Sequence, residues 1–225
     1  QFSAFRFNVS QIILAYNIVT AYANLSRQQR LAQELDFTRQ LQTMLLPKEF
    51  PDWQPFRISA FARSAKEVSG DFYDFVEVDE DRMLVAIGDA SGKGIPACML
   101  MAMARSFIRA SVARFTSLSQ LLVELNRNLY RDAGDGRFIT MALCLLDRRE
   151  QTVEFARAGH TELLIHLPGH RLRRIYPEGA ALGLMPEEVA GNFDTLSFSF
   201  LPGMSLLLFT DGITEAMNDQ GEEFG

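Results

Sequence analysis

The fold of this chain is decided by residues 68–94, which read VSGDFYDFVEVDEDRMLVAIGDASGKG. Acidic tips stand at Asp71 and Asp89, each beside a glycine, and the apolar run 83–87 between them is typical of a buried strand. Apolar and polar residues alternate over 56–61, so we expect another strand upstream of the first tip. Because glycine lets the backbone bend tightly, both tips are predicted to place carboxylates at the rim of a sheet.

A third acidic tip lies far downstream, where the apolar run 205–210 ends in Asp211 and Gly212. Three carboxylates at strand ends indicate a site for a hard divalent cation, since Mg²⁺ and Mn²⁺ prefer oxygen ligands. Two such ions about 3.5–4 Å apart can activate a water for attack on a phosphoryl group. Asp and Gly are also the commonest turn residues, so each tip taken singly is more often a turn. A shared site is favoured because all three tips follow predicted apolar strands.

Four segments carry a family pattern: VSGDFYD at 68–74, GDASGKG at 88–94, AGH at 158–160 and TDGITEA at 210–216. In this order they resemble the signatures of the metal-dependent protein phosphatases (PPM, type 2C), specifically the bacterial SpoIIE/RsbU-like branch. The resemblance covers about residues 45–225. It implies an α+β fold, a PPM-type sandwich of two antiparallel β-sheets flanked by helices, with an N-terminal helical linker.

The resemblance also implies a ligand set for two Mn²⁺ or Mg²⁺ ions. Asp89 would bridge the ions, Asp71 and the backbone carbonyl of Ala90 would serve one of them, and Asp211 would serve the other. Asp74 is a weaker candidate, because its position in the alternation is equally that of a solvated strand residue. The family has a further acidic ligand in an Asp-Asp-x-Thr motif. That motif is absent here, so we expect the C-terminal end of the domain to lie outside this sequence.

Two more residues are weak candidates for binding substrate. Lys93 stands on a glycine loop beside Asp89, where it could attract phosphate or simply be solvated. His160 could reach a phosphate, or it could be a hydrogen-bonded structural histidine at a tight turn. Covalent catalysis is disfavoured because no Ser-His-Asp or Cys-His set has suitable spacing, and a nucleotide phosphohydrolase is disfavoured because there is no P-loop spacing.

Composition narrows the class of protein. The chain has 225 residues, is 48% hydrophobic and carries a net charge of −6, which argues against nucleic acid as its main partner. Cys98 and Cys144 are isolated, as expected for structural thiols in a reducing compartment. We therefore expect a cytoplasmic catalytic domain, and membrane attachment through a region outside this sequence stays open.

Residues 1–46 are predicted to form a helical linker or dimerisation segment, the tail of an upstream sensor or signalling region, and residues 47–225 the phosphatase domain. The apolar run 12–19 is interrupted before the length that a membrane helix needs. A helix packed on its own domain and a coiled coil pairing two chains both remain open, because Thr38 and Gln42 interrupt the apolar seam. The apolar residues at helical spacing along this segment are Leu14, Ile18, Tyr22, Leu25, Leu31, Leu35, Leu41 and Leu45.

The remaining chain predicts two helices followed by strands. A helix begins near Ile95 with Pro96 in its first turn, and Ser117 is a candidate N-cap for a second helix. Met99, Met101 and Met103 are expected to pack in the core. Short β-rich runs separated by turns then cover 138–146, 152–156, 162–167, 171–175, 193–200 and 204–210.

The function implied by the resemblance is a metal-dependent protein serine/threonine phosphatase. Its expected substrate is a phosphoserine or phosphothreonine on a STAS-domain, anti-anti-sigma-type regulator in bacterial partner-switching signalling. The alternative is a non-catalytic scaffold of the same fold that binds its partner without turnover. The intact acidic tips at Asp71, Asp89 and Asp211 favour the enzyme.

Overall fold

The described residues of the computed structural model are 2–63, 70–134 and 136–225, so Val68 and Ser69 of the first family signature lie outside them. Five helices and eight strands are found in this part of the chain. The helices are α1 (Phe2–Leu45), α2 (Ile95–Ser111), α3 (Leu118–Asp132), α4 (Glu187–Ala190) and α5 (Asp211–Thr214). The strands are β1 (Asp71–Glu77), β2 (Arg82–Ala90), β3 (Ile139–Asp147), β4 (Thr152–Ala158), β5 (Leu163–Leu167), β6 (Arg171–Ile175), β7 (Thr195–Ser199) and β8 (Ser205–Leu207).

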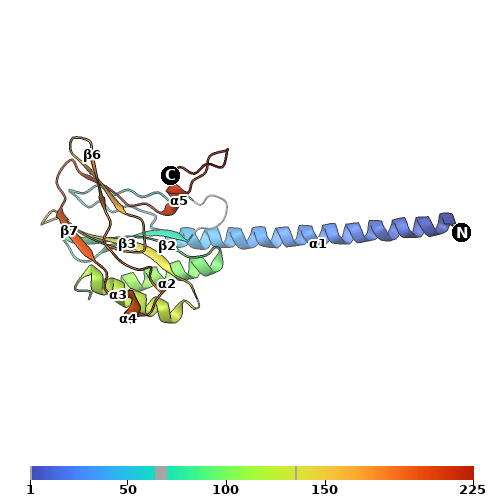
Figure 1. Cartoon of the computed structure of the whole chain (residues 1–225), viewed down its shortest axis with the longest axis horizontal. Helices are drawn as coiled ribbons and strands as arrows, with labels where there is room; N and C mark the ends of the chain where they lie inside the picture. Colours follow the sequence, from blue (N-terminus) through green and yellow to red (C-terminus); the bar gives the residue numbers. More distant parts are fainter. Residues whose placement is uncertain (1, 64–69, 135) are drawn as a thin grey trace.

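The strands form two antiparallel sheets. One has five strands in the order β1-β2-β3-β4-β7, and the other has three in the order β6-β5-β8. Helices α2 and α3 lie on the face of the larger sheet that points away from the smaller one (Figure 1). The predicted α+β sandwich of two antiparallel sheets with flanking helices is confirmed.

Two apolar cores hold the layers together because strand residues alternate between the two faces of the larger sheet. The core between helices and sheet includes Leu84 and Leu143 from the strands with Met101 and Leu122 from the helices. The core between the sheets is built from both of them. Its buried members include Met83, Cys144, Phe155, Leu163 and Ile165.

The predicted starts of α2 and α3 are confirmed. Pro96 occupies the first turn of α2, and the backbone N–H of Gln120 donates to Ser117 Oγ at 3.2 Å to cap α3. Met101 is fully buried, as expected, and Met103 is half-buried. The expectation for Met99 was wrong, because this side chain lies on the solvent face of α2 and is 62% exposed.

Two strand predictions need correction. Residues 56–61 do not form a strand: Phe56 makes a single bridge to Trp53 and stacks on Phe200, while Phe61 is exposed. Alternation alone does not make a strand, and in the described part of the chain no neighbour forms a ladder with these residues. The run 205–210 is a strand only over β8, which ends at Leu207.

Helix α1 is a single continuous helix that projects from the sandwich (Figure 1). Leu14, Ile18, Tyr22 and Leu25 are each more than half exposed, so packing against this chain's own domain is wrong for that stretch. The last turns do pack on the domain, because Thr38 and Gln42 are buried and Leu41 and Leu45 contact the helix–sheet core. Among the described helices none combines the length and hydropathy needed to cross a membrane.

Candidate metal centre

The three predicted aspartates meet at one rim of the sandwich. Asp71, Asp89 and Asp211 each offer a carboxylate oxygen, and these atoms all lie within 4.8 Å of one another. The expected strand ends are only partly right, since Asp71 begins β1, Asp89 lies within β2 and Asp211 begins α5. Folding nevertheless gathers carboxylates that lie far apart in the sequence, as the resemblance implied.

Strand pairing explains the proximity of the first two carboxylates. Asp71 and Asp89 are direct partners in the antiparallel ladder between β1 and β2, so their side chains share one face of the sheet. The close approach requires glycine at position 70, where a Cβ would lie 2.1 Å from the carbonyl oxygen of Ala90 and 2.7 Å from Asp89 Oδ1. The Ala90 N–H also donates to the Gly70 carbonyl at 3.1 Å.

Asp211 reaches the cluster from the other sheet. It follows β8, which pairs with β5, and the Thr161 hydroxyl just before β5 donates to the carbonyl of Phe209. The turn after β8 then approaches β1, since a Cβ on Gly212 would lie 3.7 Å from Asp71 Oδ2. The candidate site therefore spans the two layers of the sandwich.

The electrostatics of the cluster suit a divalent cation. The pKa of Asp89 is raised from 3.8 to about 7, chiefly by burial and then by the negative charges of Asp71, Asp211 and Glu215. Like charges on directly opposed strand residues are destabilising. An all-carboxylate donor set of this kind fits Mg²⁺ or Mn²⁺, which bind oxygen ligands and would offset the repulsion.

Comparison with known proteins places the chain. Residues 79–225 match the family described as stage II sporulation protein E (SpoIIE). The chain belongs to the SpoIIE family. It is 29% identical over 195 residues to the phosphoserine phosphatase RsbU of Bacillus subtilis, an alignment that covers 86% of this chain and 57% of RsbU. The chain spans between 34% and 57% of the length of the curated relatives that it matches.

Solved structures share the fold of this SpoIIE-family chain. The SiaA-PP2C domain of Pseudomonas aeruginosa superposes with a TM-score of 0.70 at 23% identity, covering 88% of this chain and 79% of that one. RsbX, solved in complex with magnesium, superposes with a TM-score of 0.56 at 16% identity, covering 68% of this chain and 71% of RsbX. At these identities the likeness supports the fold alone.

Asp74, the weaker candidate ligand, lies outside the carboxylate cluster of this SpoIIE-family site. Its side chain is fully buried on the opposite face of β1, so the solvated-strand interpretation is also wrong. The Arg109 guanidinium donates to both of its carboxylate oxygens at 2.7 Å, and Arg105 Nε lies 3.1 Å from Asp74 Oδ2. Asp74 therefore joins β1 to α2 through ion pairs in which the carboxylate is buried and the arginines are partly exposed.

The two weak substrate-binding candidates of the SpoIIE-family site differ in burial. Lys93 is exposed in the loop between β2 and α2. His160 is 4% exposed, follows Gly159 with its φ of 66°, and lies 2.9 Å from Thr140 Oγ1 through its Nδ1. Burial, with the nearby Arg157 charge, lowers the pKa of His160 to about 4. These observations favour the structural interpretation of this histidine.

Sequence reasoning missed two residues at the candidate site, Glu215 and Gln42. Glu215 stood in the TDGITEA segment, and its spacing of one helical turn after Asp211 could have marked it as a neighbour. Gln42 was seen only as an interruption of an apolar seam. In the structure its Nε2 donates to the backbone carbonyl of Asp71 at 3.1 Å. No local sequence pattern predicts that contact, because it joins residues from two different elements.

Proposed function

We propose that this chain is a metal-dependent protein serine/threonine phosphatase that acts in bacterial partner-switching signalling. The observation that carries the proposal is the convergence of the Asp71, Asp89 and Asp211 carboxylates within 4.8 Å of one another at the sandwich rim. Membership of the SpoIIE family and similarity to RsbU, a phosphoserine phosphatase, support it. The exposed rim leaves room for a phosphorylated side chain on a protein surface, since Asp211 is exposed.

The chain's own residues have distinct tasks in this proposal. Asp71 and the Ala90 carbonyl would hold one divalent ion, Asp211 would hold a second, and Asp89 would serve both. When bound, such ions lower the pKa of a water and neutralise charge on a transferring phosphoryl group. Gly70 keeps β1 close enough to Asp89 and Ala90 for the set to form, because any side chain there would clash. Magnesium or manganese both suit these oxygen donors, and the RsbX structure contains magnesium.

The proposed substrate is a phosphoserine or phosphothreonine on a STAS-domain protein of the anti-anti-sigma type. The deciding experiment measures phosphate release from such a phosphoprotein with Mn²⁺, with Mg²⁺ and with a chelator. We expect turnover only with metal, and loss of at least about 100-fold in Asp89→Ala because a ligand shared by both ions is removed. Asp219→Ala, which removes an exposed carboxylate outside the cluster, serves as the matched control.

Equal activity of Asp89→Ala and the control would refute the proposed mechanism. Binding of the phosphoprotein without phosphate release under all metal conditions would support the alternative, a scaffold that uses this fold without turnover.

The exposed apolar face of α1 supports a second part of the proposal, a homodimer through this helix. Leu14, Ile18, Tyr22 and Leu25 recur at helical spacing and are each 52–72% exposed. Pairing of two such helices would bury this stripe, and an upstream sensor could act through it. Light scattering should give twice the chain mass for residues 1–225 and the single mass after deletion of residues 1–30. A shortened chain that still has twice its own mass would exclude α1 as the dimer contact.

A further inference from the structure

The docked end of α1 touches the candidate metal centre through one buried side chain. Gln42 is 6% exposed, and its Nε2 donates to the backbone carbonyl of Asp71 at 3.1 Å. A buried amide is costly unless it is hydrogen-bonded, so this contact explains why a polar residue is tolerated on the packed face of α1. Its acceptor belongs to a residue whose side chain is one of the three clustered carboxylates.

Neighbouring contacts fix the helix face that carries Gln42. Thr38, one turn earlier, is 1% exposed, and its backbone carbonyl accepts from Cys98 Sγ of α2 at 3.7 Å. Leu41 and Leu45 pack against the helix–sheet core on either side. The Gln42 amide is therefore held by the last turns of α1, and its position depends on how this helix sits on α2.

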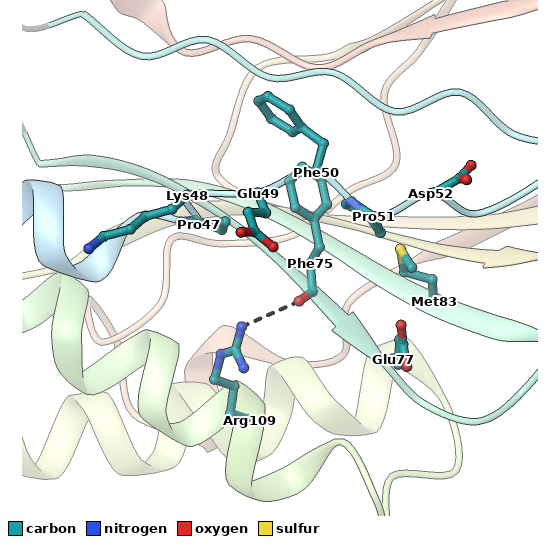
Figure 2. Close-up of a pocket in the computed structure, with 10 residues that line it drawn as sticks. All are labelled: Pro47, Lys48, Glu49, Phe50, Pro51, Asp52, Phe75, Glu77, Met83 and Arg109. Atoms are coloured by element: carbon teal, nitrogen blue, oxygen red, sulfur yellow. Dashed lines mark hydrogen bonds between the residues drawn. The ribbon is translucent and has the colours of Figure 1, made fainter.

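The hydrogen bond from Gln42 to the Asp71 carbonyl acts on strand β1. This strand is the edge strand of the larger sheet, so β2 holds it on one side only. Three residues after Asp71, the buried Asp74 carboxylate is bound by Arg109 of α2. Figure 2 shows Arg109 reaching from α2 to β1, where its Nη2 also donates to the Phe75 carbonyl at 3.3 Å. α1 thus contacts the start of β1 and α2 contacts its middle.

A surface hollow lies beside the end of β1 that is farther from Asp71. Residues 47–52 cross β1 and, with Glu77, Met83 and Arg109, line this hollow of about 570 Å³ (Figure 2). None of the three clustered aspartates lines it. The start of β1 is therefore placed by other contacts, namely the ladder with β2 and the hydrogen bond from Gln42 to the Asp71 carbonyl.

We propose that Gln42 is a positioning residue for the metal centre, which holds the Asp71 backbone so that its carboxylate meets Asp89 and Asp211. The inference rests on the proposed function, since it assigns a role toward the same metal ions. Metal–oxygen distances tolerate displacements of only about 0.2 Å, so a small shift of the Asp71 backbone weakens binding. Loss of a supporting hydrogen bond behind a ligand typically costs about 10–100-fold in metal affinity.

The test is direct Mn²⁺ binding to the whole chain, followed by the electron paramagnetic resonance signal of free Mn²⁺. Gln42→Met keeps the length and helix preference of the side chain but removes the donor. We expect its Mn²⁺ dissociation constant to rise about 10–100-fold. Gln42→Asn keeps the amide but shortens its reach, and we expect a rise in the same direction should the methionine variant fold poorly.

Two controls separate positioning from stability. Gln40→Met changes an exposed glutamine two residues away, whose amide bonds Asp36 on the same helix, and should leave the dissociation constant unchanged. Ser117→Ala removes the N-cap of α3, away from the cluster, and should lower the melting temperature without weakening Mn²⁺ binding.

The outcomes are distinguishable. Wild-type Mn²⁺ affinity in both Gln42 variants would overturn the positioning role, and so would an equal loss of affinity in Ser117→Ala. A wild-type chain that binds no Mn²⁺ would overturn the proposed function itself, and this inference with it.

Discussion

Removing the charge of Asp89 should stabilise the metal-free protein, although the same change abolishes the proposed activity. Asp89 is held among acidic neighbours, and its pKa is raised from 3.8 to about 7. At about 1.36 kcal/mol per pKa unit, ionising this carboxyl in the folded state at pH 8 costs on the order of 4 kcal/mol. The site is half open to solvent, so screening reduces the effect, and we expect a gain of ~1–3 kcal/mol for Asp89→Asn.

The pH window follows from the direction of the shift. Below pH 4 the carboxyl is protonated in both the folded and the unfolded chain, so it costs nothing. Between about pH 4 and pH 7 the unfolded chain releases this proton while the folded chain keeps it, so the contribution of Asp89 to wild-type stability falls as pH rises. Asparagine does not titrate. The advantage of Asp89→Asn should therefore grow across this window and level off above pH 7.

Thermal unfolding with a chelator at pH 5 and pH 8 measures the effect. For a chain of this size ~1–3 kcal/mol corresponds to a melting-temperature rise of several degrees at pH 8. Asp219→Asn, at an exposed position outside the cluster, should show no such pH dependence. Saturating Mn²⁺ should reverse the order, since ligand at 100 times its dissociation constant adds about 2.7 kcal/mol to the wild type. A metal-free Asp89→Asn variant that is less stable than wild type at pH 8 would refute the reasoning.

Three more perturbations have outcomes that the structure specifies. Gly70→Ala places a Cβ 2.1 Å from the Ala90 carbonyl oxygen, so β1 must shift and Mn²⁺ affinity measured by titration should fall at least about 10-fold. Asp74→Ala removes a buried carboxylate that binds the partly exposed side chains of Arg105 and Arg109, and it should lower the free energy of unfolding in urea by about 1.5–3 kcal/mol. Asp79→Ala, in an exposed pair, should lower it much less. The buried His160, whose pKa is lowered to about 4, resists protonation, so its contribution to stability should fall by about 3 kcal/mol as pH drops from 6.5 to 4, opposite in sign to the contribution of Asp89. Urea unfolding at the two pH values should show this loss as a difference between wild type and His160→Gln, which lacks it.

Much of the fold could be predicted because local rules decide it. The α2 and α3 boundaries follow from Pro96 and Ser117, which act within one helical turn. The strand predicted over residues 56–61 was wrong because alternation specifies the two faces of a strand but not its partner. A strand forms only when a neighbouring strand completes its hydrogen bonds. The prediction that Met99 packs in the core was wrong for a related reason, since side-chain type alone does not say which face of a helix the sheet covers.

At the candidate site, too, some residues could be identified from the sequence and others could not. Asp71, Asp89 and Asp211 could be selected from the sequence because glycines and apolar runs mark them and the family pattern orders them. The ion pair of Asp74 and the contact of Gln42 could not, because each depends on which helix lies against β1. A buried Asp and a buried Gln look like surface residues until the packing is known. Sequence patterns therefore do not identify residues that support a site through contacts between different elements of the fold.

The carboxylates of the cluster come from both layers of the sandwich, two from the larger sheet and one from the turn after β8. A cation held among them would join the two sheets, which share the apolar core described above. Loading the site should then slow the breathing of one sheet against the other. Amide hydrogens of β5 and β8 would exchange with solvent less readily, even though these strands supply no ligand of their own.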